Sequence, residues 1–397
     1  KMTSVTLGGK TYGIHRTMGM GAFGKVHVMV NRDDFNDLLA LKVMSKSMML
    51  QKGDRTISHI IMERHILMRI KSPFVVNLYC TFQDSRELYM VLDFMGGGDL
   101  LYQMTAHDMK LKESWVVFWT ACILMGLKHI HSKHIIHRDI KPENVMLNSS
   151  GYARLTDFNV STLLLECDDY LTRGTSGTRL YMAPEMFRNK ELGVKESPKY
   201  GYECDVWSMG ITVYELLTGS TPYPRLKSKD KVFDNFEVKE YLDEKQQSRM
   251  EFSAKEIQYS DKLSEKAKQF LKRILVHRSE RATVDDLFDD PFFEDIDWGK
   301  LEKGELEPPF VPDQKANVDK YYALVDSGIM EDQKSLRVKE ADQVKFEGWN
   351  WCDEGFEVAQ SKKKSKSKLK RGENSSGSHS NSLSLEELIM ESRSSRK

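Results

Sequence analysis

One short charged run, between residues 137 and 144, constrains this chain more than any other feature of its sequence. It reads His137-Arg-Asp139-Ile-Lys141-Pro-Glu-Asn144, and Asp157-Phe-Asn begins thirteen residues after Asn144. The run brings together a carboxylate that can accept a proton, a cation, and an amide oxygen of the kind that binds Mg²⁺. This combination is typical of a catalytic loop, and a charged surface loop is the alternative explanation.

A glycine-rich segment lies near the start of the chain. Residues 19–26 read Gly-Met-Gly-Ala-Phe-Gly-Lys-Val, and glycines let backbone amides approach phosphates without a Cβ in the way. The pattern alone is weak, because dinucleotide-binding folds use a similar string and chance turns are common. Here it lies between predicted strands, and the next strand brings Lys42, whose charge suits phosphate oxygens. Glu63, on the helix predicted after that strand, is placed to hold Lys42, although a solvated helix face is the usual explanation for such a residue.

The predicted secondary structure changes character at the triple glycine of residues 96–98. Before it, strands surround one helix near residues 57–70, and after it helices dominate, most clearly at 115–131 and 206–217. This predicts an α+β fold with a small lobe of residues 12–95 and a larger helical lobe of residues 96–293. Residues 294–360 are charged with spaced aromatics, so we expect an extension pinned to the globule. Residues 361–397 are basic and Ser-rich, and we expect them to be disordered.

Composition restricts the classes of partner. The formal net charge is zero, but residues 361–397 hold ten basic and four acidic side chains. This basic tail could bind an anionic membrane surface or act as a nuclear signal, and the alternative is a solvated linker without a binding partner. Five scattered cysteines without metal-ligand spacing predict reduced thiols, and no apolar stretch reaches the roughly 20 residues of a membrane span. We expect a monomer in the cytoplasm, with nuclear or peripheral-membrane location as alternatives, and no nucleic-acid partner. Because the chain begins at Lys1, we also expect that its native start and any lipid signal are missing.

Further motifs complete a recognisable series. From Tyr12 to Phe293 the chain resembles eukaryotic protein kinases in the order and spacing of its motifs, and Arg281 is placed to pair with Glu185. It is identified as a member of the AGC group of Ser/Thr kinases, and within that group it is most similar to the YANK subfamily. Asp205-Val-Trp207-Ser-Met-Gly210 belongs to the general kinase series. The strings that carry the finer resemblance are Leu155-Thr-Asp157-Phe-Asn159, Tyr181-Met-Ala-Pro-Glu-Met186, Pro309-Phe-Val-Pro312 and Asn317-Val-Asp319.

The resemblance implies an ATP-dependent kinase that transfers the γ-phosphate to Ser or Thr hydroxyls of proteins, with Mg²⁺ or Mn²⁺ as cofactor. Asp139 would orient and deprotonate the acceptor hydroxyl, and Lys141 would neutralise the phosphoryl group in transfer. Asn144 and Asp157 would bind the metal. The alternative from another class is a pseudokinase scaffold that binds nucleotide without turnover.

The resemblance also implies a nucleotide site. Leu92 is the expected gatekeeper, and Val26, Ala40 and Met146 are expected to sandwich the adenine. A hydrophobic stack of Leu67, Leu78, His137 and Phe158 would couple the lobes, and Tyr321 or Tyr322 would cover the nucleotide. The expected ATP-binding residues are Met18, Gly19, Met20, Gly21, Ala22, Phe23, Gly24, Lys25, Val26, Ala40, Lys42, Glu63, Leu92, Asp93, Met95, Asp99 and Met146.

For the substrate, the resemblance places carboxylates of Asp99, Glu143 and Glu215 near the peptide residues before the phosphoacceptor, together with Thr178. Three carboxylates around one groove would favour arginine. The alternative is that Asp99 serves only the ribose and Glu215 is structural.

The chain departs from the AGC pattern at three places. Asn159 replaces the usual glycine, and if that position needs a positive φ, asparagine is the least costly substitute. Gly174 falls where a phosphothreonine is usual, which leaves Thr172 and Thr175 as candidate phosphorylation sites facing Arg138. Residues 346–351 resemble a hydrophobic motif with Asn350 at the phosphoacceptor position, although plain aromatic anchoring explains them equally well.

Overall fold

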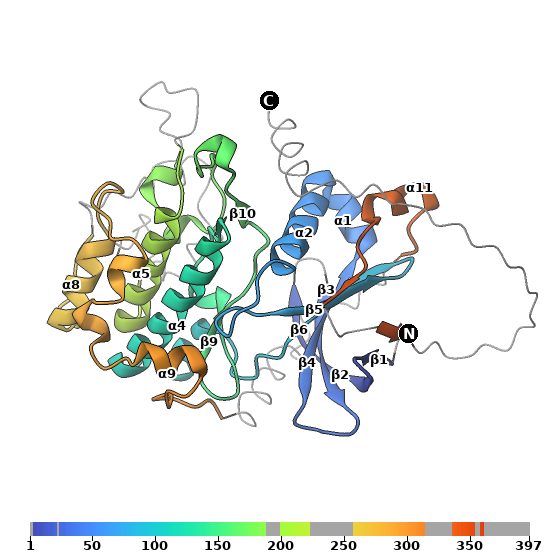
Figure 1. The fold of residues 1–397 in the computed structure, drawn as a ribbon, viewed down its shortest axis with the longest axis horizontal. Helices are drawn as coiled ribbons and strands as arrows, with labels where there is room; N and C mark the ends of the chain where they lie inside the picture. The colour runs from blue at the N-terminus through green and yellow to red at the C-terminus, as the bar shows by residue number, and fades with distance from the viewer. Residues whose placement is uncertain are drawn as a thin grey trace, which may run out of the picture. The chain divides into compact units, whose positions relative to one another are not determined.

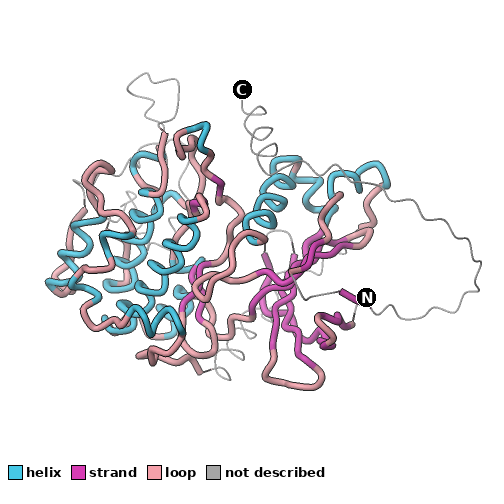
Figure 2. Tube along the Cα trace, viewed as in Figure 1, coloured by secondary structure: helices cyan, strands magenta, loops and turns pink. Residues whose placement is uncertain are grey.

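The computed structural model describes residues 3–21, 24–187, 199–222, 257–313, 336–353 and 358–360. The chain divides into a small lobe of residues 1–68, 77–95 and 315–397, and a large lobe of residues 69–76 and 96–314. Strands dominate the first and helices the second (Figure 2). Residues 69–76 lie within the sequence range expected for the small lobe. They group with the large lobe because the Val76 amide donates to the Leu155 carbonyl, and the Leu155 amide donates to the Phe74 carbonyl.

The small lobe is built on one antiparallel sheet. Its strands are β1 (Ser4–Leu7), β2 (Lys10–Gly21), β3 (Gly24–Asn31), β4 (Leu38–Ser45), β5 (Leu78–Gln83), β6 (Glu87–Asp93), β11 (Trp351–Cys352) and β12 (Val358–Gln360), in the order β11-β5-β6-β4-β3-β2-β1-β12. Strands β1 to β6 are labelled in Figure 1. Both edge strands therefore come from the C-terminal extension.

The sheet is strongly curled, and chain length alone requires it. Seven strand spacings of about 4.8 Å would separate the edges of a flat sheet by roughly 34 Å. Residues 353–357 join β11 to β12 and reach only roughly 20 Å when fully extended. Consistent with curling, Val5 and Leu7 of β1 share one buried core with Cys80 and Phe82 of β5.

Two helices follow β4 in the small lobe. Ser45 caps α1 (Lys46–Lys52) by accepting the Met48 amide, and α2 (Asp54–Leu67) follows directly. The helix predicted near residues 57–70 is α2, with Ile57 and Ile60 among its buried residues. Two charged side chains, Glu63 and Arg64, are also buried on α2. Because buried charges are costly unless paired, both indicate specific partners.

The first half of the extension docks on α1. Its α11 (Glu340–Gln343), drawn in red, and the 3-10 turn η8 (Val344–Phe346) lie beside α1 (Figure 1). The buried Lys46 Nζ donates to Gln83 Oε1 at 2.6 Å and to Gln343 Oε1 at 2.6 Å, and it lies 5.0 Å from the centre of the Phe346 ring. Gln83 Nε2 in turn donates to the Phe346 carbonyl at 2.8 Å. Burial lowers the pKa of Lys46.

The second half docks on α2 and β5. Trp349 is 2% exposed, and its carbonyl accepts from Arg64 Nε at 2.8 Å and from Thr81 Oγ1 at 2.5 Å. Its indole N–H donates to the Tyr89 carbonyl at 3.3 Å. The Asn350 carbonyl accepts from Arg64 Nη2 at 3.5 Å. The extension thus supplies two carbonyls that accept from the buried Arg64, in addition to Thr81 Oγ1 of β5 at 3.2 Å, and it covers the open edge of the sheet.

The large lobe is mainly helical, with α3 (Leu100–Ala106), α4 (Glu113–Ser132), α5 (Glu203–Thr218), α8 (Glu265–Ile274) and α9 (Trp298–Lys303). The helices predicted at 115–131 and 206–217 are α4 and α5. Two short ribbons pair β7 (Ile135–Ile136) with β10 (Thr162–Leu163), and β8 (Val145–Leu147) with β9 (Ala153–Leu155). The catalytic and metal-binding residues predicted for this lobe lie in the connections beside these ribbons.

The start of the extension packs on the large lobe. Phe310 contacts the rings of Trp115 and Trp119, with centroids 4.5 and 5.7 Å apart. The Tyr152 hydroxyl donates to the Leu306 carbonyl at 2.6 Å. In the parts of the chain that the structure describes, no helix is both long and apolar enough to cross a membrane.

Candidate active site

Asp139 is the centre of a dense hydrogen-bond network in the large lobe. Its Oδ1 accepts the Thr178 amide at 2.7 Å, and its Oδ2 accepts from Lys141 Nζ at 2.8 Å and from Asn144 Nδ2 at 2.9 Å. Lys141 Nζ also donates to Thr178 Oγ1 at 2.7 Å. Burial raises the pKa of Asp139, but the Lys141 charge and the hydrogen bonds outweigh it, so the net pKa is lowered. Asp139 is therefore an ionised carboxylate in fixed orientation.

Asp205 on α5 fixes the loop that carries Asp139 by hydrogen bonds to its backbone. Asp205 is fully buried, and its two oxygens accept the His137 amide at 2.8 Å and the Arg138 amide at 2.7 Å. His131 Nε2 lies 2.9 Å from Asp205 Oδ2. Arg138 has a left-handed backbone, with φ of 68°. A non-glycine residue is held in this conformation only where its surroundings impose it, and such residues cluster at active sites.

Asn144 and Asp157 supply the oxygen donors expected for a metal. Asn144 Nδ2 donates to both the carbonyl and the carboxylate of Asp139, so the amide oxygen must face away from Asp139. The Thr156 amide donates to the Asn144 carbonyl at 3.0 Å, which ties the segment before Asp157 to the catalytic loop. Amide and carboxylate oxygens are the ligands that Mg²⁺ prefers, with water and phosphates completing its shell. The described residues hold no cluster of three His, Cys, Asp or Glu side chains suited to a metal, and a kinase metal site does not require one.

The conformation after Asp157 differs from the sequence expectation. Asp157 has a positive φ of 62°, whereas Asn159 is not among the described residues with positive φ. The explanation of Asn159 as a substitute for a left-handed glycine is therefore wrong for this conformation. Phe158 is fully buried, with its ring centroid 4.7 Å from that of His137, as the predicted stack requires within this lobe.

In the small lobe, the predicted pair of Lys42 and Glu63 is confirmed. Lys42 Nζ lies 2.6 Å from Glu63 Oε1, and Glu63 is 3% exposed while Lys42 remains partly open to solvent. The register of the strands places Val26 opposite Lys42 and Ala40 opposite Leu92. Since side chains alternate between the faces of a strand, these four residues share one face of the sheet. The buried core of Leu39, Leu41, Met29 and Val91 occupies the other face.

The glycine-rich segment forms the hairpin between β2 and β3, with Gly21 paired to Gly24. A Cβ at Gly24 would lie 1.7 Å from the Val43 carbonyl oxygen, so β4 excludes any side chain there. Met18, Gly19, Met20 and Lys25 lie on the paired strands of this hairpin, and Ala22 and Phe23, at its tip, are outside the described residues.

The remaining predicted nucleotide residues fall in both lobes. In the small lobe, the Asp93 carboxylate accepts from Asn77 Nδ2 at 2.8 Å and from the Tyr79 hydroxyl at 2.7 Å, and Met95 is buried. In the large lobe, Asp99 and Met146 form an isolated bridge. Tyr321, Tyr322, residues 317–319 and the basic tail lie outside the described residues.

Three acidic residues meet near the catalytic loop in the large lobe. Glu215 on α5 is 8% exposed, and it accepts a short hydrogen bond from the Tyr181 hydroxyl. Burial, followed by the charges of Glu215 and Glu143, raises the pKa of Tyr181. Burial and the charge of Glu143 raise the pKa of Asp99 to about 6, although the Tyr102 amide donates to Asp99 at 2.7 Å and caps α3. Asp99 thus has a structural role as the cap of α3.

The activation segment is held by a tyrosine that the sequence did not single out. The Tyr200 hydroxyl accepts from Arg138 Nη1 at 3.4 Å and donates to the Gly174 carbonyl at 2.6 Å. Of the two candidate phosphorylation sites, Thr172 is buried and bridges to the Tyr200 backbone. Thr175 is exposed, and its hydroxyl donates to the Met186 carbonyl at 3.0 Å. Tyr200 therefore links Arg138 to the segment at Gly174 without a phosphate.

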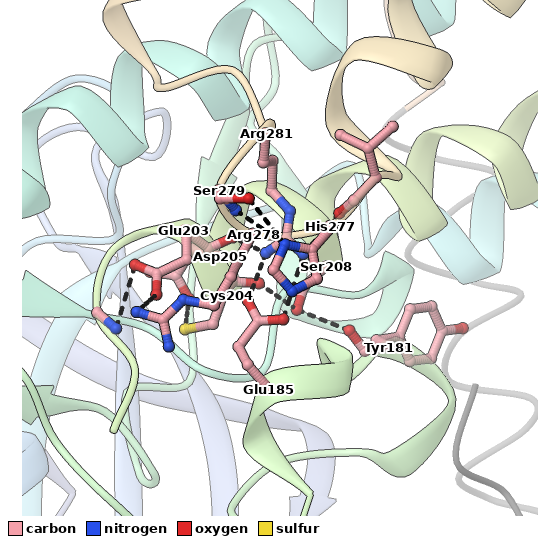
Figure 3. A network of polar contacts seen from close by, with 12 residues as sticks. Tyr181, Glu185, Glu203, Cys204, Asp205, Ser208, His277, Arg278, Ser279 and Arg281 are labelled. Carbon is pink, nitrogen blue, oxygen red and sulfur yellow. Dashed lines mark hydrogen bonds and ion pairs between the residues drawn. The ribbon is translucent and has the colours of Figure 1, made fainter. Parts of the chain in front are cut away.

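The end of this segment is fixed by the predicted pair of Arg281 and Glu185, which is confirmed. Arg281 Nη1 lies 2.5 Å from Glu185 Oε1, and Arg281 also donates to the Glu203 carbonyl at 2.8 Å (Figure 3). Ser208 on α5 donates to the Tyr181 carbonyl at 2.7 Å in the same network. The network fixes residues 181–185 to α5, which also carries Asp205.

Comparison with known proteins agrees with this geometry. The family model described as the protein kinase domain matches residues 12–293. Human Serine/threonine-protein kinase 32B is 31% identical over 316 residues, which cover 78% of this chain and 70% of that protein. The RAC family serine/threonine-protein kinase homolog of Dictyostelium discoideum is 32% identical over 304 residues, with 76% and 62% covered. Mouse Serine/threonine-protein kinase MRCK alpha is 30% identical over 342 residues, which cover 85% of this chain and 19% of that protein. The matched region is thus less than two thirds of the Dictyostelium and mouse proteins. The chain therefore belongs to the protein kinase family, as an ATP-dependent serine/threonine kinase of the AGC group.

Proposed function

We propose that this kinase is catalytically active with Mg²⁺ and prefers Ser or Thr residues that follow arginine. The observation that carries the first part is the ionised Asp139, held by Thr178, Lys141 and Asn144. A pseudokinase scaffold would not need a proton acceptor whose orientation is fixed by three neighbouring residues.

Catalysis then follows from position and charge. Asp139 orients the acceptor hydroxyl and takes its proton, and Lys141, 2.8 Å from Asp139, balances negative charge beside it. Lys42, fixed by Glu63, holds nucleotide phosphates. Asn144 and Asp157 would hold Mg²⁺, which supplies charge neutralisation of the phosphates when bound.

Asp139→Asn tests this proposal, with Asp295→Asn at an exposed site as the matched control. We expect kcat to fall by at least ~10² with nucleotide affinity nearly unchanged, because general-base catalysis contributes ~10²–10⁴. Turnover of Asp139→Asn within a few-fold of the parent would refute Asp139 as the base. A parent protein that binds ATP but transfers no phosphate to any basic peptide would favour the scaffold.

The preference for arginine is supported by the carboxylates of Asp99, Glu143 and Glu215. Burial, and then the charge of Glu143, raise the pKa of Asp99, and a guanidinium bound beside this carboxylate would stabilise its ionised form. Each Arg–carboxylate contact is expected to contribute roughly 1 kcal/mol, the weaker end of the range for charged hydrogen bonds, or about fivefold in kcat/KM.

A peptide library measures this preference. We expect arginine to be selected two and three residues before the phosphoacceptor, and Glu215→Gln to weaken selection at one of these positions. Tyr181→Phe removes the hydrogen bond to Glu215 but leaves the Glu215 carboxylate in place. This variant should therefore preserve the preference for arginine. Selection of acidic or proline-directed sites would contradict the proposal and leave the kinase activity intact.

Monomeric state and cytoplasmic location stay predictions. So does the role of residues 361–397, as a membrane-binding or nuclear segment or as a solvated linker.

A further inference from the structure

Two cysteines that lie far apart in the sequence face each other in the small lobe. Cys352 of β11 is the direct cross-strand partner of Cys80 of β5. Both are thiols, and no disulfide joins these two described residues. β11 is the strand by which the extension closes one edge of the sheet, so this pair lies at the junction between the extension and the small lobe.

The hydrogen bonds of the ladder identify the type of pair. The Asp353 amide donates to the Tyr79 carbonyl at 2.9 Å, which makes Asp353 and Tyr79 a hydrogen-bonded pair. Hydrogen-bonded and non-hydrogen-bonded pairs alternate along an antiparallel ladder. Cys352 and Cys80, one step along, are therefore a non-hydrogen-bonded pair, in which Cα atoms are about 4.5 Å apart and side chains are closest. A disulfide spans Cα separations of about 4.4–6.8 Å.

The two thiols differ in access. Cys80 is fully buried in the core of the curled sheet, whereas Cys352 packs against the same core but remains partly exposed. Burial, and then the neighbouring Cys352, raise the pKa of Cys80. Since the thiolate is the reactive form and access controls oxidation, a soluble oxidant would meet Cys352 first.

We propose that Cys80 and Cys352 form a reversible disulfide that fixes the C-terminal extension to the small lobe, with a hydroperoxide as the oxidant. The Cys352 thiolate attacks the O–O bond of hydrogen peroxide, which forms a sulfenic acid and releases hydroxide. The Cys80 sulfur then attacks the Cys352 sulfur, so that an S–S bond forms and the S–O bond breaks. The Cys80 proton leaves with the departing hydroxide as water, and overall two thiols and one peroxide give one disulfide and two waters.

The consequence of the bond follows from its neighbours. Trp349, three residues before Cys352, is the aromatic anchor over Arg64, so a bond at Cys352 prevents this anchor from leaving. The closed loop holds more than two thirds of the chain, and long loops restrict the unfolded chain most. This inference does not rest on the proposed catalysis, because bond formation is measured without any kinase assay.

The test treats the full chain with hydrogen peroxide and then measures intact mass and peptides under non-reducing conditions. The variants are Cys352→Ser, Cys80→Ala and, as matched control, Cys167→Ser, which removes an exposed cysteine outside this core. We expect the parent and Cys167→Ser to lose two hydrogen atoms in mass and to give one linked peptide pair holding Cys80 and Cys352. We also expect the Tm to rise by about 5 °C or more, and dithiothreitol to reverse both changes.

Cys352→Ser and Cys80→Ala should show neither the linked pair nor the change in Tm. The proposal is overturned if the parent takes up oxygen atoms at Cys352 without linkage, or if Cys167 is in the bond that forms. It is also overturned if either variant keeps the loss of two hydrogen atoms.

Discussion

Replacing Trp349 by alanine is the most direct test of how the extension supports the small lobe. Its indole is 2% exposed and donates to the Tyr89 carbonyl at 3.3 Å, and the Arg64 guanidinium lies 5.7 Å from the ring centre. Truncation therefore removes apolar burial, one hydrogen bond and one cation–π contact together.

The magnitude has a ceiling set by the structure. Truncating a buried Trp to Ala costs about 3–5 kcal/mol when the site cannot collapse. In this protein the extension can detach from the small lobe instead, which releases Arg64 into water. The loss of stability therefore cannot exceed the free energy by which the extension docks on the small lobe. Burial lowers the pKa of Arg64 to about 10, so near neutral pH the side chain is a buried cation, and water gives it alternative partners once the extension leaves. We expect a loss of about 3 kcal/mol, which corresponds to a fall in Tm of roughly 6–12 °C.

Scanning calorimetry and limited proteolysis measure the two aspects of this change. The first thermal transition should move down, and the segment around residues 336–353 should become more sensitive to protease. Trp351→Ala, at a half-buried neighbouring position, is the matched control and should cost less than half as much. A Trp349→Ala loss under about 1 kcal/mol, or one equal to the control, would refute the docking argument.

Two further predictions concern the large lobe. Tyr200→Phe keeps the buried ring but removes the hydroxyl between Arg138 and Gly174. Because lost buried hydrogen bonds cost about 1–3 kcal/mol, we expect kcat to fall by roughly tenfold with little change in the KM for ATP. An unchanged kcat in steady-state assays would show that this link does not position the activation segment. The pKa of Asp99 is raised to about 6 in the folded protein, so Asp99 binds its proton more tightly there than in the unfolded chain. The stability that this proton contributes is fully present below about pH 4 and is lost as the pH rises through about 6. Under the proposed preference, only ionised Asp99 attracts arginine. The KM for an arginine-containing peptide should therefore rise as pH falls below about 6 in the parent but stay flat in Asp99→Asn, which retains the helix cap. Parallel pH profiles would contradict this role for Asp99.

The chemical groups of the site were predictable from the sequence because they lie in short motifs. Asp139, Lys141 and Asn144 lie within six residues, so the backbone of one loop brings them together. The pairs Lys42–Glu63 and Arg281–Glu185 were also predicted, from the order of the motifs rather than from local spacing. The change from strands to helices at residues 96–98 followed from periodicity.

Contacts between distant segments were decided only by the tertiary structure. β12 is three residues long and β11 two, too short for any periodic signal, and they become strands because the curled sheet offers them open edges. The left-handed conformation falls on Asp157 rather than Asn159, although asparagine is the residue type that residue preferences alone would have favoured for it. Tyr200 meets Arg138, and Cys352 meets Cys80, through packing that places them opposite each other, since residue type at one position carries no information about a partner so far along the chain.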